Sequence, residues 1–360
     1  MGKNEKTENK RITPEELKKF CVAAMLKCGM NEEASQIAAD VLITTDAMGV
    51  HSHGTRSLRQ YLKRMRAGGL DCKAVPEIIK QGGSWAMVDG HNALAMVTGH
   101  EAMEIAIDKA KTSGIAYVGV RNSCHFGAAG YYANMAAQAD MIGIVMSNVD
   151  PNMTIPGTRG RGIGSNPLAY AVPTGKEPPV VFDIALSTVA AGKVDAARFE
   201  GKTIPSDWLV DLEGVVTTDP QLYPKNAALA PLGSHKGYGL ALMVEIFSAV
   251  LSGAAALSGV KSWVLEDAGN PTFQGHGFIV INVADMMPID SFKKRMDEMI
   301  REIKGLPKGK DSKGIFLPGE MEWQKRKETM EKGMQLPDEV LHNLKGLAED
   351  VGLVFEEYLN

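Results

Sequence analysis

The sequence predicts a mixed α/β (α+β) fold in which a strand-rich core lies between helical segments. Apolar residues recur at helical spacing near both ends, whereas between them short runs rich in β-branched residues alternate with helical patterns. The chain has 360 residues, of which 44% are hydrophobic and 23% are charged, so it can bury a large core as ordinary globular proteins do.

Residues 1–75 are expected to form an N-terminal helical segment. Residues 13–16, Thr-Pro-Glu-Glu, have the pattern of a capping box, and the apolar residues that follow are spaced as on one face of a helix. A second helix is expected over residues 31–49 and a third over residues 58–65, which a pair of glycines then ends.

Residues 76–320 are expected to form the α/β core, and residues 321–360 a C-terminal helical segment that packs against the N-terminal layer. Strands are expected over the runs Ile115–Val120, Ile142–Met146, Leu168–Val172, Val180–Phe182 and Phe278–Ile281. Helices are expected at about residues 95–112, 127–139, 236–252 and 290–303.

Charge and cysteine content exclude several classes of protein. The 39 basic residues are outnumbered by 43 acidic ones, and no long basic stretch suggests a nucleic-acid surface. The four cysteines form no C-x-x-C pair, so neither a disulfide framework nor a thiolate metal site is indicated. No signal peptide is visible and no apolar run approaches the ~20 residues of a membrane span. We expect a soluble cytoplasmic protein without a metal.

The glycine fingerprint of a Rossmann fold is absent. The nearest segment, residues 160–164, has the wrong spacing, and Pro167 prevents a helix from starting directly after it. A dinucleotide would therefore have to bind by another arrangement.

The segment His51-Ser52-His53-Gly54 lies between two expected helices. A histidine beside a hydroxyl, with Arg56 and Arg59 shortly after it, could bind a carboxylate and protonate a carbonyl oxygen. The alternative is a polar turn with solvated histidines.

A second polar segment, residues 122–130, links an expected strand to an expected helix. Its small residues would let backbone amides approach an anion such as a pyrophosphate. His125 is either an acid–base group or a packing group, and a tight turn with a satisfied histidine is the alternative. Cys124 could be a nucleophile, but no base-orienting group is evident near it.

Asp183 and Lys236 also stand at the ends of expected elements. Asp183 could meet ribose hydroxyls or orient a histidine, or it could cap a helix over residues 187–193. Lys236 stands at the start of a glycine-flanked helix, where the helix dipole disfavours a cation, so an anionic ligand such as a phosphate is indicated.

Taken together, these segments resemble the malate/L-lactate dehydrogenase family that is distinct from the Rossmann-type enzymes. Its relatives include ureidoglycolate dehydrogenase, sulfolactate dehydrogenase, diketogulonate reductase and piperideine-carboxylate reductase. The resemblance extends in order from about residue 12 onward and rests on DAMGVHSHGTRSLRQY, VRNSCHFGAAGYYA, GSNPLAYAVP, VFDIALSTVAAGKV, GSHKGYGLALMVEIFSAVLSG and LPGE.

The resemblance implies a non-Rossmann dinucleotide-binding core with a largely mixed or antiparallel sheet. It implies an oxidoreductase that uses NAD or NADP, with NAD favoured, to interconvert small 2-hydroxy and 2-oxo carboxylic acids as a homodimer. The alternatives are a reductase of cyclic imines and a catalytically inactive nucleotide-binding relative. Lys193 favours the dehydrogenases, because the reductases carry an aspartate relay there.

By the same resemblance, the catalytic residues are Ser52, His53 and His125, and Arg56 binds the substrate. The residues that would line the cofactor are His125, Phe126, Gly127, Ala128, Ala129, Asp183, Ile184, Ala185, His235, Lys236 and Gly319.

One position departs from the family pattern. Ser57 stands where many relatives carry the arginine that binds the substrate carboxylate. We expect Arg56 to supply this function and Arg59 to be a solvated surface cation.

Overall fold

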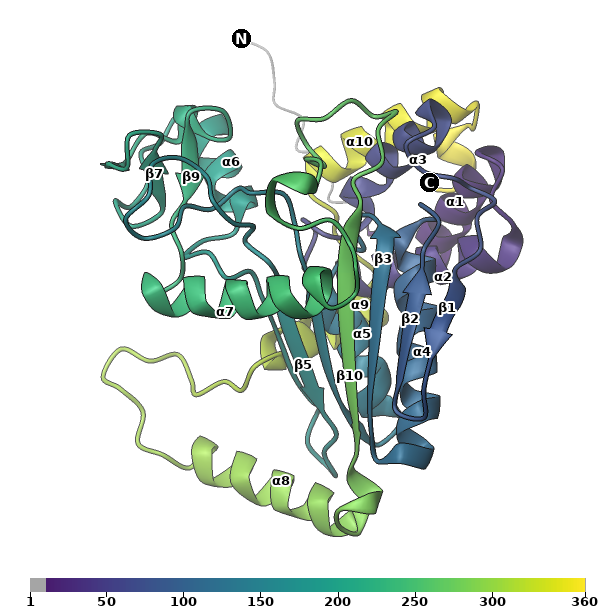
Figure 1. The fold of residues 1–360 in the computed structure, drawn as a ribbon, viewed down its shortest axis with the longest axis vertical. Helices are drawn as coiled ribbons and strands as arrows, with labels where there is room; N and C mark the ends of the chain where they lie inside the picture. The colour runs from purple at the N-terminus through teal and green to yellow at the C-terminus, as the bar shows by residue number, and fades with distance from the viewer. Residues whose placement is uncertain (1–10, 360) are drawn as a thin grey trace.

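The computed structural model describes residues 11–359, which form a seven-stranded sheet with helices on both faces (Figure 1). The strand order is β1-β2-β3-β10-β4-β5-β6, and every neighbouring pair is antiparallel except β2 and β3. This confirms the expected mixed, largely antiparallel sheet. The strands are β1 (Glu77–Gln81), β2 (Trp85–Asp89), β3 (Ile115–Ser123), β4 (Met141–Ser147), β5 (Leu168–Val172), β6 (Val180–Ile184) and β10 (Gln274–Asn282).

The centre of the sheet is built from strands far apart in the sequence. Phe278 on β10 is in register with Val118 on β3 and with Val145 on β4, and all three side chains are fully buried. These apolar residues fill the layer between the sheet and helices α4 (Ala95–Ser113) and α5 (Ala129–Gln138), which lie against β3 and β4.

A helical layer joins the two ends of the described chain, as Figure 1 shows beside β1 and β2. Phe20 meets Phe355 and Tyr358 edge-on, with ring centroids 5.7 and 5.8 Å apart. These helices share the hydrophobic cluster of the sheet and are α1 (Pro14–Lys27), α2 (Glu32–Ala47), α3 (Leu58–Ala67) and α10 (Asp338–Val351). Helix α9 (Glu320–Lys332) lies against α2.

The opposite face of the sheet carries α7 (His235–Glu245) and the π-helical turn Ile246–Val250 that continues it (Figure 1). A small sheet with the order β8-β7-β9 and helix α6 (Ala191–Phe199) form a second hydrophobic cluster next to α7. Its strands are β7 (Leu209–Asp211), β8 (Val216–Thr217) and β9 (Ala227–Leu229). Helix α8 (Ile289–Lys304) follows β10.

Most expected elements are present. The capping box is confirmed, since Thr13 and Glu16 bond to each other's backbone amides. The helix expected over residues 187–193 starts only at Ala191, because the Thr188 amide donates to the Ala230 carbonyl and keeps this segment extended. Within residues 11–359, no helix combines the length and apolar character needed to cross a membrane.

Arg64 on α3 is fully buried and holds the long loop before β10. Its two terminal nitrogens donate to backbone carbonyls of that loop, and its guanidinium lies 4.6 Å from the ring centre of Trp263. The acceptors are the carbonyls of Ser262, Trp263, Asp267 and Asn270, at 3.3, 2.9, 3.4 and 3.0 Å. Gly69 lets the loop approach, because a Cβ there would lie 2.2 Å from the Ala268 oxygen.

Replacing Arg64 with methionine should lower the free energy of unfolding by at least about 2 kcal/mol, because hydrogen bonds to a buried charge contribute about 1.5–3 kcal/mol each. Urea unfolding measures this change. Arg66→Met is the matched control on the same helix. Arg66 is 43% exposed and pairs with Asp350, so its loss should cost at most about 1 kcal/mol. Equal costs would contradict the anchoring function of Arg64.

Candidate active site

The two candidate histidines lie together although they are 72 residues apart. His53 comes from the turn between α2 and α3, and His125 from the turn between β3 and α5. Their rings are nearly parallel, with centroids 5.5 Å apart. The Ser52 hydroxyl lies 2.8 Å from His53 Nδ1. The structure therefore assembles Ser52, His53 and His125 in one place.

Two aromatic residues enclose His125. The Tyr61 hydroxyl is hydrogen-bonded to His125 Nδ1, and Tyr61 is fully buried on α3. The Trp263 ring is nearly parallel to the imidazole, with centroids 5.7 Å apart, and it also contacts Tyr61 at 4.9 Å. Neither residue stood out in the sequence, where Tyr61 reads as part of an apolar helix face and Trp263 as part of a loop.

The surroundings of both histidines favour the neutral imidazole at ordinary pH. Burial, with smaller contributions from His53 and His276, lowers the pKa of His125 to about 3. Burial also lowers the pKa of His53, with a second contribution from the positive charge of Arg56. A neutral imidazole can give one N–H hydrogen bond to a carbonyl oxygen and accept a proton at its other nitrogen.

Asp46 fixes the turn that carries Ser52 and His53. This buried carboxylate accepts the Thr55 amide at 2.8 Å, the Thr55 hydroxyl at 2.6 Å and His51 Nδ1 at 2.8 Å. A Cβ on Gly54 would lie 2.2 Å from Asp46, so this position requires glycine. His51 is thus a structural partner and not a solvated histidine. The signal in the sequence was an aspartate on the apolar face of α2.

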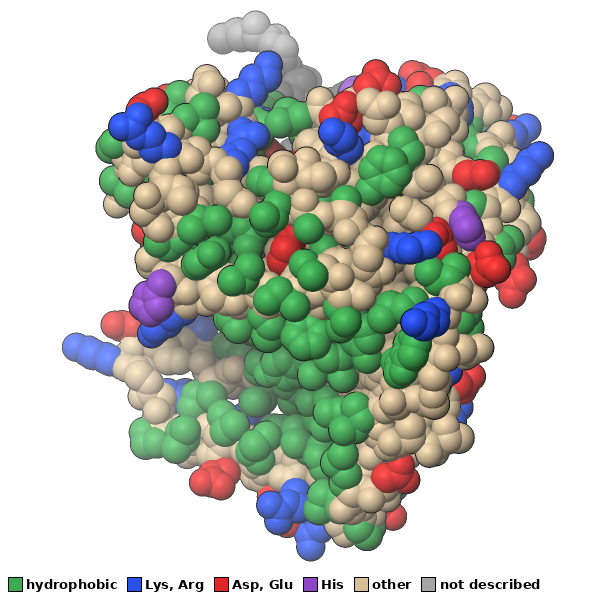
Figure 2. All heavy atoms as spheres, viewed as in Figure 1, with side chains coloured by type: hydrophobic (Ala, Val, Ile, Leu, Met, Phe, Trp, Pro, Cys, Tyr) green, Lys and Arg blue, Asp and Glu red, His purple; other side chains and the backbone are tan. Residues whose placement is uncertain are grey.

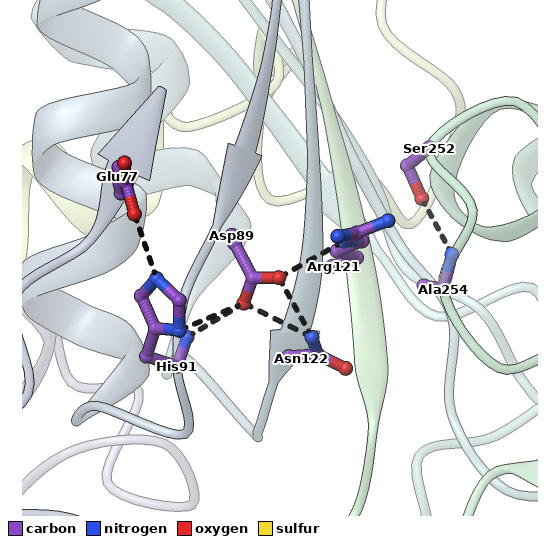
Figure 3. Close-up of polar contacts among 7 residues, drawn as sticks. All are labelled: Glu77, Asp89, His91, Arg121, Asn122, Ser252 and Ala254. Carbon is purple, nitrogen blue, oxygen red and sulfur yellow. Dashed lines mark hydrogen bonds and ion pairs between the residues drawn. The ribbon is translucent and has the colours of Figure 1, made fainter. Parts of the chain in front are cut away.

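A second carboxylate network supports the end of β3. Asp89 is 5% exposed and accepts both the Asn122 side-chain amide, at 2.9 and 3.0 Å, and Arg121 Nε, at 3.0 Å (Figure 3). Figure 3 also shows His91 between Asp89 and Glu77, and the His91 amide donates to Asp89 at 3.0 Å. Burial opposes ionisation of Asp89, but these donors together lower its pKa. The network fixes β3 three residues before His125.

The segment after His125 rests on a buried aromatic stack. The Phe126 ring lies 4.3 Å from the parallel ring of His276 and 4.8 Å from Tyr132, whose hydroxyl donates to the Phe126 carbonyl. His276 is fully buried between the hydroxyls of Ser147 and Ser123, each 2.9 Å from one ring nitrogen. The Phe126 side chain is therefore part of the core, and only its backbone can face a ligand.

The structure brings the candidate cofactor segments together. Asp183 Oδ2 accepts the Gly130 amide at 2.7 Å, which joins residues 183–185 to the start of α5. Asp183 therefore accepts an amide in the first turn of α5, and the alternative that it caps a helix over residues 187–193 is wrong. Gly319, with φ +82°, packs directly on Val181, and a Cβ there would lie 2.6 Å from the Val181 oxygen.

The start of α7 joins the same region. The Leu232 amide donates to the Leu186 carbonyl at 3.0 Å, which places the turn before His235 and Lys236 next to Ala185. Both His235 and Lys236 are exposed in the first turn of α7.

The first turn of α6 reaches the histidine pair. A Cβ on Gly192 would lie 3.9 Å from the Ser52 Cβ. Lys193, the next residue on α6, is therefore near the turn that carries Ser52 and His53.

The arginines are engaged in ion pairs. Arg56 Nη2 lies 2.6 Å from Glu339, and Arg59 Nε lies 2.7 Å from Asp350. The side chain of Arg59 is 38% exposed, so Arg59 is a surface cation that pairs with a carboxylate. The interpretation of Cys124 as a nucleophile fails, because the thiol is fully buried and burial raises its pKa to about 12.

A sequence model of one family, described as malate/L-lactate dehydrogenase, matches residues 12–345. The chain belongs to this family. It is 39% identical over 350 residues to a malate dehydrogenase of Pyrococcus abyssi, covering 95% of each chain. It is 31% identical over 334 residues to a ureidoglycolate dehydrogenase (NAD(+)) of Escherichia coli, covering 93% of this chain and 95% of the relative.

Solved structures of the malate/L-lactate dehydrogenase family agree with the fold. Sulfolactate dehydrogenase from Methanocaldococcus jannaschii superposes with a TM-score of 0.90 at 34% identity, covering 97% of this chain and 100% of that one. The family and the oxidoreductase class expected from the motifs are confirmed. The chain therefore belongs to this family although its sequence has no Rossmann fingerprint.

His276 should make the stability of this family member depend on pH. Burial lowers the pKa of His276 to about 3, below the value of about 6.5 for an unfolded histidine, so the unfolded chain binds the proton first as the pH falls. The contribution is complete above about pH 6.5 and is lost progressively toward pH 3.

Between pH 7.5 and pH 5.0 the wild type should therefore lose about 2 kcal/mol more unfolding free energy than His276→Gln. Urea unfolding at the two pH values measures both losses. Each protein is compared with itself, so a general destabilisation by the substitution cancels. Identical losses would show that His276 does not titrate as a buried group.

Proposed function

We propose that this enzyme uses NAD or NADP to interconvert a small 2-hydroxy acid and the corresponding 2-oxo acid. The observation that carries the proposal is the stacked pair of neutral imidazoles, His53 and His125, beside four segments that can hold a dinucleotide. The malate, sulfolactate and ureidoglycolate dehydrogenases among its relatives support this substrate class.

The residues around the site fit a nicotinamide dinucleotide. Gly127, with φ +81°, keeps the turn after His125 free of a side chain, and Asp183 is exposed nearby for ribose hydroxyls. Lys236 lies in the first turn of α7 and makes no ion pair with any residue from 11 to 359, so a phosphate can be its partner. NAD is favoured because the E. coli relative is named for it.

When bound, the cofactor supplies or accepts the hydride at the substrate α-carbon. The remaining chemistry belongs to side chains of this protein. A neutral imidazole N–H can donate a hydrogen bond to the substrate carbonyl oxygen and deliver a proton to it during reduction. In the oxidation direction the same nitrogen accepts the hydroxyl proton. Ser52 holds the His53 ring through its Nδ1.

Arg56 is proposed to bind the substrate carboxylate. Its present partner Glu339 has a side chain that is 63% exposed, so this ion pair contributes at most about 1 kcal/mol. A bidentate substrate carboxylate can therefore replace Glu339 at little cost.

We also propose that the enzyme is a homodimer in the cytoplasm. Figure 2 shows hydrophobic side chains gathered over α7 and the sheet below it. Exposed apolar residues of this face include Leu240, Leu242, Ile246, Val250 and Leu251, with exposed fractions of 40–66%. A continuous apolar face of this kind marks a surface that another chain covers. All four cysteines are unpaired, which fits a reducing compartment.

His53→Ala and His125→Ala should each lower kcat for reduction of 2-oxo acids by roughly 10²–10⁴-fold, because a positioned acid–base group contributes that much. The measurement is NADH and NADPH consumption with a panel of 2-oxo acids and cyclic imines. His342→Ala is the control, since His342 is an exposed histidine on α10.

The panel separates the candidate functions. Turnover of oxo acids by the wild type supports the proposal, whereas turnover confined to cyclic imines would identify a reductase. No turnover of any substrate would identify an inactive relative. Near-wild-type activity of both alanine variants would reject the two histidines as proton carriers.

Lys236→Ala should raise the KM for the nicotinamide cofactor at least about tenfold and leave the KM for the oxo acid nearly unchanged, because a charge-assisted hydrogen bond to phosphate is lost. Fluorescence titration of NADH binding measures the affinity directly. Lys225→Ala, which removes an exposed lysine from the loop before β9, is the control. Unchanged cofactor binding would remove Lys236 from the site.

A further inference from the structure

We propose that Tyr61 is a positioning residue that holds His125 in a single tautomer, with the proton on Nε2. The imidazole then presents a fixed N–H donor to the reacting oxygen, and His53 is left to carry the proton. This inference rests on the proposed function, in which both histidines face the substrate.

The first step is the direction of the hydrogen bond between Tyr61 and His125. A phenol has one O–H donor, and the structure gives Tyr61 one hydrogen-bond partner that can accept it among residues 11–359, the Nδ1 atom of His125. The backbone amide of Gly127 also acts on the phenol oxygen, but as a donor. If Nδ1 carried a proton, the buried O–H of Tyr61 would be left without an acceptor, which is strongly disfavoured.

The second step is the charge state of the pair. Tyr61 is fully buried, and burial raises the pKa of its hydroxyl, so the phenol keeps its proton. The burial that lowers the pKa of His125 keeps the imidazole neutral. A neutral imidazole whose Nδ1 accepts a hydrogen bond must carry its proton on Nε2.

The third step is the rigidity of the donor. Tyr61 is packed against Trp263, with ring centroids 4.9 Å apart, and Arg64, one turn further along α3, holds the loop that carries Trp263. The phenol oxygen therefore cannot turn away from His125 without displacing this packing. The ring orientation and the tautomer of His125 are fixed together.

His53 lacks such a constraint. Its Nδ1 atom faces the Ser52 hydroxyl at 2.8 Å, and a hydroxyl can rotate to donate or to accept. Ser52 is also exposed. His53 can therefore exchange tautomers during a turnover, as a proton carrier must, whereas His125 cannot. The two stacked rings would then perform different tasks: His125 polarises the carbonyl and His53 moves the proton.

The test is a nitrogen NMR measurement on the full-length protein with ¹⁵N-labelled histidine, using long-range proton–nitrogen correlations that distinguish the two tautomers. The spectrum of His125→Asn identifies the His125 signals. In the wild type we expect a protonated Nε2 and an unprotonated Nδ1 for His125, from pH 6 to pH 8. In Tyr61→Phe we expect a mixture of tautomers.

Tyr131→Phe is the matched control, because it removes a tyrosine hydroxyl that donates to Asp40 and does not contact His125. Its His125 signals should equal those of the wild type. A proton on His125 Nδ1 in the wild type would by itself overturn the proposal, whatever the variants show. An unchanged single tautomer in Tyr61→Phe would overturn it as well.

Steady-state kinetics separate this proposal from the proposed function. Tyr61→Phe should lower kcat for oxo-acid reduction about tenfold or more and leave the KM for the cofactor unchanged, since it removes orientation and not binding. If His125→Ala keeps wild-type turnover, the proposed function of His125 fails, and the NMR spectra still decide whether Tyr61 sets the tautomer. A Tyr61→Phe enzyme with wild-type kcat would contradict the positioning function.

Discussion

Helix α3 carries the interaction on which the rest of the site depends, because a buried cation and a buried phenol lie one turn apart on it. The guanidinium of Arg64 donates to backbone carbonyls of the loop before β10, and the nearby carboxylates of Asp267 and Glu266 add charge interactions. Burying a charge is costly unless such partners are supplied, so the loop can take few other conformations. That loop brings Trp263 against His125, while Tyr61 reaches the same ring from the helix. The packing of α3 in the core therefore also determines the orientation of the His125 ring, a candidate catalytic group.

Buried carboxylates perform a complementary task at the turns. Asp46 stabilises the turn that carries His53 by accepting the Thr55 amide, and Asp89 stabilises the end of β3 by accepting the Asn122 side-chain amide. Glu245, which is 2% exposed, accepts the side-chain amides of Asn148 and Asn166 and the Leu257 amide, at 3.2, 2.8 and 2.8 Å. It thereby ties α7 to the strands β4 and β5. In each case an acidic group satisfies donors that a turn leaves unpaired, so the polar groups of the site are held before any ligand arrives.

Periodicity predicted the long elements well, because β3, β4, β5, β6 and β10 are apolar runs and the helices between them have clear apolar faces. It could not predict β1, whose five residues are all exposed, or the position of β10 in the middle of the sheet, which depends on pairing with strands more than 120 residues away. The motif histidines were found because polar residues in small-residue turns are unusual. Tyr61, Trp263 and His276 were missed, because a buried aromatic residue on a helix, loop or strand looks like ordinary core until its neighbours are known.

The contact between the two ends of the described chain has a consequence for synthesis. Helix α1 ends at Lys27 and helix α10 begins at Asp338, yet Phe20 completes its packing only on Phe355 and Tyr358. About 300 residues must be translated between these helices, which takes on the order of half a minute at about 5–20 residues per second. During that time the apolar faces of the first helices are exposed on the nascent chain. The contact between α1 and residues 355–358 can form only after every strand of the sheet has been translated.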